Sequence, residues 1–175
     1  MGLSLMVFIT TLFRPDAILL LGLQRISLDE RPWTMVTSMF VHAGFGHIFA
    51  NMLTLYFFGS YLLQLIGSRY FLLVYFVGGI LGNILFLLLA SPFAIAVGAS
   101  GAVFAVGGAL TVLQPKLRVF IFPIPVPIPL WIAVIGGFVI MLLPSIAWQA
   151  HLGGLVLGLA AGYLFRRREH RAYWR

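Results

Sequence analysis

Two apolar runs decide the fold class: GHIFANMLTLYFFGSYLLQLI at residues 46–66 and YFLLVYFVGGILGNILFLLLA at residues 70–90. Neither run contains a charged residue, and only Gly67, Ser68 and Arg69 separate them. At a rise of 1.5 Å per residue, each run makes a helix of about 30 Å, which matches the hydrocarbon thickness of a bilayer. We therefore predict two membrane-spanning helices joined by a short turn.

The rest of the chain has the same apolar character. Of its 175 residues, 62% are hydrophobic and only 9% are charged, whereas soluble domains carry roughly 25% charged residues. This composition excludes a soluble enzyme and a disordered scaffold, because the polar side chains are too few to cover a soluble surface. Further apolar runs lie at 2–13, 99–115, 129–143 and 149–165. We predict an all-α membrane protein, a six-transmembrane-helix bundle that forms one domain over residues 1–175.

The charged residues lie in the connections between these runs. Residues 14–45 hold three of the four acidic residues and are predicted to form a long interfacial loop. Prolines at every second position from Pro123 to Pro129 exclude a helix and predict a stiff, extended connection. With six spans, eight of the eleven basic residues lie on the side of both termini, including those of the tail 166–175. The positive-inside rule then predicts a cytoplasmic tail and an integral protein of the cell membrane. Because these basic residues flank apolar runs, they do not indicate a nucleic acid partner.

The few strongly polar side chains inside the predicted spans include His47, Asn51, Asn83, Ser100 and His151. Such groups are costly in hydrocarbon, which makes them candidates for function. Counting upward from the basic residues places all of these except Asn83 in one layer, about 23–33 Å from the cytoplasmic side. Four polar groups at a similar depth suggest a common site.

The helix faces give the same indication. His151 shares one face of its helix with Gly154, Gly158 and Gly162, and small residues of this kind let a neighbouring helix approach closely. Ser100 likewise aligns with Gly107, Gly108 and Thr111. We therefore expect Ser100 and His151 to meet inside the bundle. His47 and Asn51 form an i, i+4 pair on a third helix.

The chemistry of this set favours nucleophilic catalysis. No Asp or Glu lies in any span and no HExxH motif is present, so we expect neither an aspartyl protease nor a metal or cofactor site. A proton or cation transporter usually places an acid near the midplane. A serine and a histidine instead form a dyad in which the histidine removes the hydroxyl proton. Asn51, His47 and the backbone N–H of Ser100 are candidate donors to a developing oxyanion.

Each residue also has a purely structural interpretation. Ser100 is a suitable helix cap after the Pro92 turn, and His151 is a suitable interfacial residue at a helix start. Asn51 and Asn83 are typical of hydrogen bonds between membrane helices. His47 and His42 also fit the water-facing edge of a loop. The coincidence of depth and face favours the catalytic interpretation of the dyad.

Three motifs resemble those of the rhomboid serine intramembrane proteases. They are HxxxN at His47–Asn51, GxSG at Gly98–Gly101, and AHxxGxxxG at Ala150–Gly158. The resemblance implies that Ser100 is the nucleophile and His151 the base, with Asn51, His47 and Gly98 stabilising the oxyanion or the substrate. Its implied substrates are transmembrane proteins in a lipid bilayer, cut in or near their membrane spans. His42 sits where many members have a histidine, and Phe104 stands where many members have a tyrosine.

Two other functions remain open. A rhomboid-like protein that binds transmembrane helices without cutting them would share the fold but not the activity. A small transporter or channel using the same polar layer would not depend on the serine hydroxyl. For the protease, we expect a water-filled cavity that opens on the non-cytoplasmic side, because water is consumed in hydrolysis.

Overall fold

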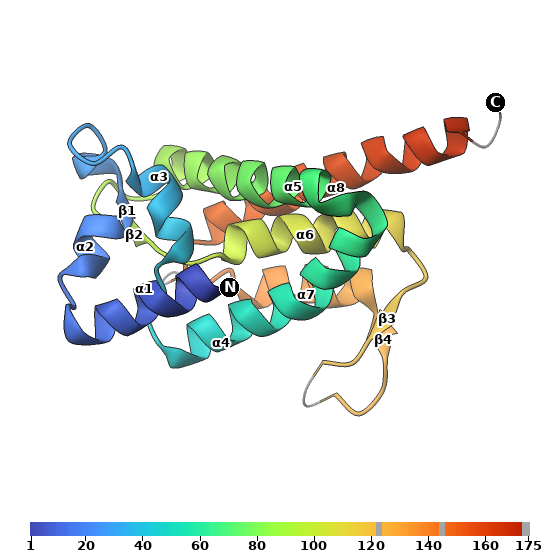
Figure 1. The fold of residues 1–175 in the computed structure, drawn as a ribbon, viewed down its shortest axis with the longest axis horizontal. Coiled ribbons are helices and arrows are strands. Elements are labelled where there is room, and N and C mark those ends of the chain that lie inside the picture. The colour runs from blue at the N-terminus through green and yellow to red at the C-terminus, as the bar shows by residue number, and fades with distance from the viewer. Residues whose placement is uncertain (122–123, 144–145, 173–175) are drawn as a thin grey trace.

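The structure is a computed structural model that describes residues 1–121, 124–143 and 146–172, and it is mostly helical (Figure 1). The eight α-helices of this part are α1 (Gly2–Phe13), α2 (Ala17–Leu21), α3 (Thr34–Thr37), α4 (Phe45–Thr54), α5 (Ser60–Leu89), α6 (Ser100–Leu113), α7 (Leu130–Ile140) and α8 (Trp148–Ala172). Two short 3-10 helices, η1 (Arg25–Ser27) and η2 (Ser38–Phe40), precede α4. A π-helical turn, η3 (Leu55–Gly59), joins α4 to α5.

The chain reverses direction within the helical run from Phe45 to Leu89. Gly67 has φ 77° and ψ 165°, a conformation that breaks the helix and is readily accessible only to glycine. Figure 1 shows α4 and the later part of α5 running in opposite directions on either side of this bend. The predicted turn between residues 66 and 70 is therefore confirmed. Of the described residues, only Phe45–Leu89 forms a helical run long and apolar enough to cross a membrane, and Gly2–Phe13, Ser100–Leu113 and Leu130–Ile140 form shorter apolar helices.

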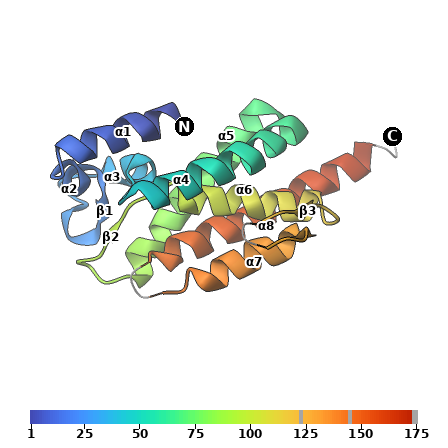
Figure 2. The ribbon, with the colours of Figure 1, turned by 90° about the horizontal axis from the view of Figure 1, so that it is seen from below.

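Helix α6 lies at the centre of the molecule. It packs against α5, α7 and α8, and Figures 1 and 2 show it surrounded by the other long helices. Its buried residues include small ones on several sides, among them Ala102, Ala105 and Ala109. A helix that is apolar all round is typical of a buried position. The central position of α6 places its first residue, Ser100, inside the bundle.

Helix α8 approaches α6 closely along the predicted face. A side chain built on Gly154 or Gly158 would collide with the backbone of Gly101 or Ala105, and one on Gly162 would lie 2.7 Å from the Ala109 oxygen. On α6 the glycines Gly107 and Gly108 are both buried, as predicted, but they face different neighbours. Gly108 faces the backbone of α8, but Gly107 faces Val134 on α7. The face of α6 against α8 is thus Gly101, Ala105, Gly108 and Ala109.

The connections contain more structure than the sequence predicts. In the 14–45 loop, β1 (Leu23–Gln24) pairs antiparallel with β2 (Ile95–Ala96), which ties this loop to the chain just before Ser100. After α6, β3 (Arg118–Val119) pairs with β4 (Ile128–Pro129). The predicted extended connection is thus one arm of a hairpin, because its end folds back onto the chain that follows α6. Pro123 itself lies outside the described residues.

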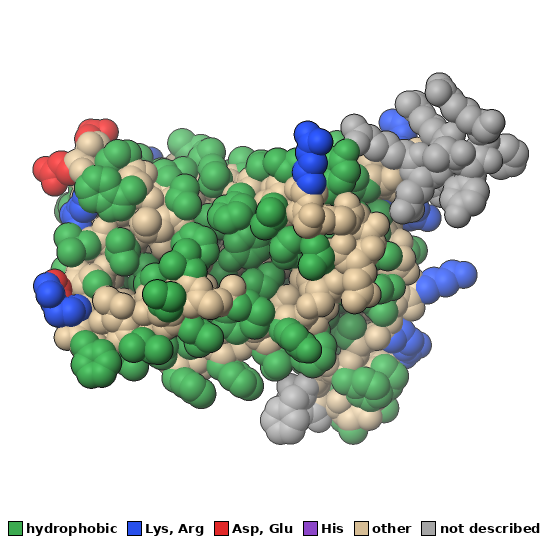
Figure 3. Space-filling view, viewed as in Figure 1, with side chains coloured by type: hydrophobic (Ala, Val, Ile, Leu, Met, Phe, Trp, Pro, Cys, Tyr) green, Lys and Arg blue, Asp and Glu red, His purple; other side chains and the backbone are tan. Residues whose placement is uncertain are grey.

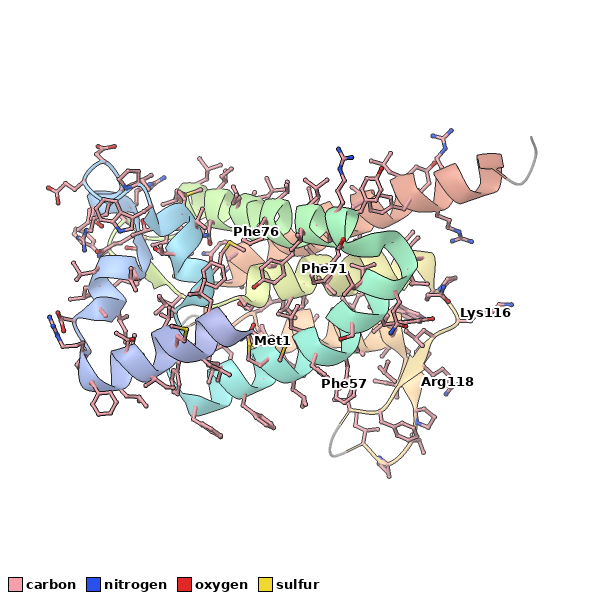
Figure 4. The ribbon with its side chains drawn as sticks, in the orientation of Figure 1. Met1, Phe57, Phe71, Phe76, Lys116 and Arg118 are labelled. Carbon is pink, nitrogen blue, oxygen red and sulfur yellow. The ribbon has the colours of Figure 1, made fainter. Side chains whose placement is uncertain are left out.

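The surface is apolar along the bundle and charged toward its ends. Figure 3 shows acidic side chains at one end and several Lys and Arg side chains at the other, beside the end of α8. Lys116 and Arg118 extend away from the bundle at this second end (Figure 4). At the acidic end, Arg14 donates a hydrogen bond of 2.9 Å to Asp16. This hydrogen bond lowers the pKa of the exposed Asp16 carboxyl below its usual value.

Candidate active site

Two helix starts bring Ser100 and His151 together. Ser100 is the first residue of α6, and His151 lies in the first turn of α8. The Ser100 Oγ and His151 Nε2 atoms are 2.7 Å apart, a hydrogen-bond distance, and His151 is only 4% exposed. With the proton of a neutral imidazole on Nδ1, Nε2 accepts the hydrogen bond from the serine hydroxyl. This is the ground-state arrangement of a nucleophile beside its base.

The other nitrogen of His151 has no such contact. Nδ1 is buried and has no hydrogen-bond partner within the described part of the chain. The imidazole instead packs against the ring of Phe104, with centroids 4.9 Å apart and planes inclined by 30°. In the described residues, packing rather than a third polar group therefore orients the imidazole.

Gly98 lies between the Ser100 hydroxyl and the His47 ring. Its φ of 123° belongs to the region that favours glycine. A Cβ at this position would lie 2.7 Å from His47 Nε2 and 3.6 Å from Ser100 Oγ. The His47 ring can thus lie this close to the chain before Ser100 only because residue 98 has no side chain.

Asn51 is buried one helical turn after His47. Its Nδ2 donates a hydrogen bond of 2.9 Å to the His47 carbonyl oxygen, which uses one of the two amide protons. The backbone N–H of Gly98 donates to the Ser38 carbonyl oxygen at 2.9 Å, so this amide is already paired. The first backbone N–H groups of α6 have no acceptor within the helix. These N–H groups and the second Asn51 proton are the donors available beside His47.

Ser38 was not identified from the sequence, and Asn83 was interpreted as a contact between membrane helices. Ser38 and Asn83 contact each other and, through Ser38, reach Gly98. No spacing or motif marks Ser38, because its role depends on the path of the 14–45 loop. The described residues hold no group of three His, Cys, Asp or Glu side chains that could bind a metal ion.

Comparison with known proteins identifies the family. The family profile described as the Rhomboid domain matches residues 29–168 of the 175. The chain belongs to the rhomboid family. Rhomboids are embedded in membranes.

Individual relatives of this rhomboid come from plants, yeast and bacteria. RHOMBOID-like protein 1 of Arabidopsis thaliana is 33% identical over 143 residues, which cover 81% of this chain and 36% of the relative. Rhomboid protein 1, mitochondrial, of Saccharomyces cerevisiae is 31% identical over 74% of this chain and 41% of its own length. The protein named "Putative rhomboid protease YdcA" of Bacillus subtilis is 28% identical over 81% of this chain and 71% of its own length. This rhomboid thus spans less than half of the plant and yeast relatives and most of the bacterial one.

Proposed function

We propose that this rhomboid is an intramembrane serine endopeptidase that hydrolyses peptide bonds in or near the transmembrane segments of other proteins. The observation that carries the proposal is the 2.7 Å contact between Ser100 Oγ and His151 Nε2, beside the His47 ring that packs against Gly98. A nucleophile, a base and donors to the developing oxyanion are the parts that acyl transfer requires. A transporter or channel would have no use for this pairing.

In the proposed mechanism, the Ser100 oxygen attacks the scissile carbonyl carbon while His151 Nε2 takes the hydroxyl proton. The carbonyl oxygen becomes an oxyanion beside Gly98, within reach of His47, Asn51 and the first amides of α6. Collapse of this intermediate breaks the C–N bond, and His151 returns its proton to the leaving amine. A water molecule then gives a proton to His151 and attacks the acyl-enzyme, which regenerates Ser100 and releases the acid product.

The membrane arrangement we propose has six spans, formed by α1, α4 with the start of α5, the rest of α5, α6, α7 and α8. Both termini then lie on the cytoplasmic side of the cell membrane, because the basic end of the molecule includes the tail. Ser100 and His151 lie toward the opposite end, in a cavity that admits water. The non-helical backbone between α5 and α6 is tolerated at that depth because it lines such a cavity.

The substrate must expose its carbonyl to Ser100. A stable helix pairs every carbonyl with an amide four residues later, so the substrate has to unwind locally before attack. Small or helix-breaking residues near the cut lower the cost of this unwinding. Substrates with Gly near the cleavage point should therefore be cut faster than uniform Leu/Ala helices.

The test is cleavage of a transmembrane test substrate by the purified protein in detergent and in vesicles. Ser100→Ala and His151→Ala should each reduce the rate by at least about a thousandfold, while Ser60→Ala, an exposed serine on α5, should cut normally. If the folded wild type does not cut any such substrate but still binds it, the protein binds transmembrane helices without proteolysis. Cleavage that survives in Ser100→Ala would overturn the proposed mechanism.

A further inference from the structure

Two of the buried polar side chains outside the dyad, Asn83 and His42, have no part in the proposed mechanism. Asn83 on α5 is 6% exposed, and His42, between η2 and α4, is 1% exposed. Burying such groups is costly unless hydrogen bonds compensate for the lost contact with water. Both side chains are connected by hydrogen bonds, directly or through Ser38, with Gly98 and Ala99, the two residues before Ser100.

Asn83 anchors the end of the 14–45 loop to α5. Its Nδ2 donates to the Met35 carbonyl oxygen at 2.8 Å and to Ser38 Oγ at 3.0 Å. Because a backbone carbonyl only accepts, the contact with Met35 fixes which end of the amide points to the loop. Both protons of the amide are thus used to hold α3 and η2 in place.

The anchored loop in turn holds the chain before Ser100. The Ser38 carbonyl oxygen accepts the hydrogen bond of the Gly98 N–H at 2.9 Å. His42 Nε2 accepts the longer contact of the Ala99 N–H at 3.5 Å, and its Nδ1 lies 3.3 Å from the Phe40 carbonyl oxygen. Since an N–H only donates and a carbonyl only accepts, these contacts require a neutral His42 with its proton on Nδ1.

Two successive amides, those of Gly98 and Ala99, are therefore held by one segment, Ser38–His42. The next residue carries the hydroxyl that meets His151, and Gly98 is the residue that borders His47. A rotation of the 98–99 peptides would move Ser100 relative to His151 and change the packing of Gly98 against the His47 ring. A displacement of about 1 Å at a reacting group reduces a rate by roughly a hundredfold.

We propose that Asn83 and His42 are positioning residues that set the Gly98–Ala99 backbone, and through it the Ser100 hydroxyl, in the reactive geometry. This inference rests on the proposed function and deepens it. Neither side chain contacts the substrate. Asn83 acts through Ser38, and His42 acts through the Ala99 amide.

The test compares Asn83→Leu and His42→Leu, which remove the polar contacts at similar volume, with His42→Gln, whose side-chain oxygen replaces Nε2 as acceptor. Thr11→Val is the matched control, because Thr11 is also 6% exposed and bonds only within α1, to the Phe8 carbonyl oxygen. The readouts are kcat and KM on a transmembrane substrate, the rate of Ser100 labelling by a fluorophosphonate, and the melting temperature. All rates are measured at a temperature well below the melting temperature of each variant and are divided by the amount of folded protein.

Asn83→Leu and His42→Leu should lower kcat and the labelling rate by about ten- to hundredfold, with KM nearly unchanged, and His42→Gln should recover most of the loss. Folded variants that lose melting temperature but label and cut like Thr11→Val would overturn the positioning role and leave the proposed function intact. If Asn83→Leu does not fold, the positioning role is tested by His42→Leu and His42→Gln alone. Equal rates in these two variants would then overturn it. A folded wild type that neither labels nor cuts would overturn the proposed function and this inference with it.

Discussion

At the scale of single residues, the orientation of the His151 imidazole depends on packing. Its Nδ1 has no hydrogen-bond partner in the described part of the chain, and the Phe104 ring lies 4.9 Å away. Phe104→Ala should therefore let the imidazole rotate and lower kcat by about ten- to hundredfold at nearly constant KM. Phe104→Tyr keeps the ring and should retain most of the activity. Equal kcat values for wild type and Phe104→Ala would show that something other than this ring orients His151.

The dyad also predicts the direction of the pH dependence. His151 accepts the serine proton only as a neutral imidazole, so the protonated form is inactive. The value of kcat/KM should rise with pH through a single ionisation and then level off, when measured between about pH 4 and pH 9. Melting temperatures over the same range serve as the control for folding. A rate that stays constant toward acid pH in a folded protein would exclude His151 as the base.

The sequence was sufficient to predict the pairing of Ser100 with His151, but it was not sufficient to predict the role of Ser38. The cost of polar groups in hydrocarbon singled out Ser100 and His151, and depth and helix face predicted that they meet. Ser38 could not be found in this way, because its carbonyl reaches Gly98 through the path of a loop. Asn83 was interpreted as a contact between helices, whereas its partners lie in the 14–45 loop.

At the scale of helices, the contact of α6 with α8 holds the dyad together. A side chain on Gly158 would collide with the Ala105 backbone, which cannot move as a side chain can. Gly158→Val should lower the free energy of unfolding by about 3 kcal/mol or more. The matched control is Gly136→Val on α7, where a Cβ would have no atom of the described residues within 4 Å. Thermal unfolding in detergent gives the melting temperature of each variant. Equal melting temperatures for Gly158→Val and Gly136→Val would contradict the close packing of α6 against α8.

The faces of the helices were predicted only where the small residues are regularly spaced. On α8 the four-residue repeat of Gly154, Gly158 and Gly162 predicted the contact, because glycine at this spacing allows backbones to touch. On α6 small residues lie on several sides, so the sequence could not tell which of them face α8 and which face α7. The β1–β2 and β3–β4 pairs are only two residues long and leave no alternating pattern to detect.

At the scale of the whole molecule, the charge distribution predicts the orientation in the membrane. The chain has no cysteine, so single cysteines introduced at chosen positions can be labelled without a background. In intact cells, a membrane-impermeant maleimide should label Phe93→Cys, in the turn after α5, but not Lys116→Cys. After permeabilisation both should react. If only Lys116→Cys were labelled in intact cells, the protein would lie in the membrane in the orientation opposite to the one proposed.

The Ser100–His151 dyad is best tested by finding which residue a fluorophosphonate modifies in the folded, detergent-solubilised protein. We expect one adduct, located on Ser100 by mass spectrometry of its peptide. This adduct should be absent in Ser100→Ala, strongly reduced in His151→Ala and unchanged in Ser60→Ala. An adduct on another serine, or labelling of Ser100 at the same rate without His151, would contradict a Ser100–His151 catalytic dyad.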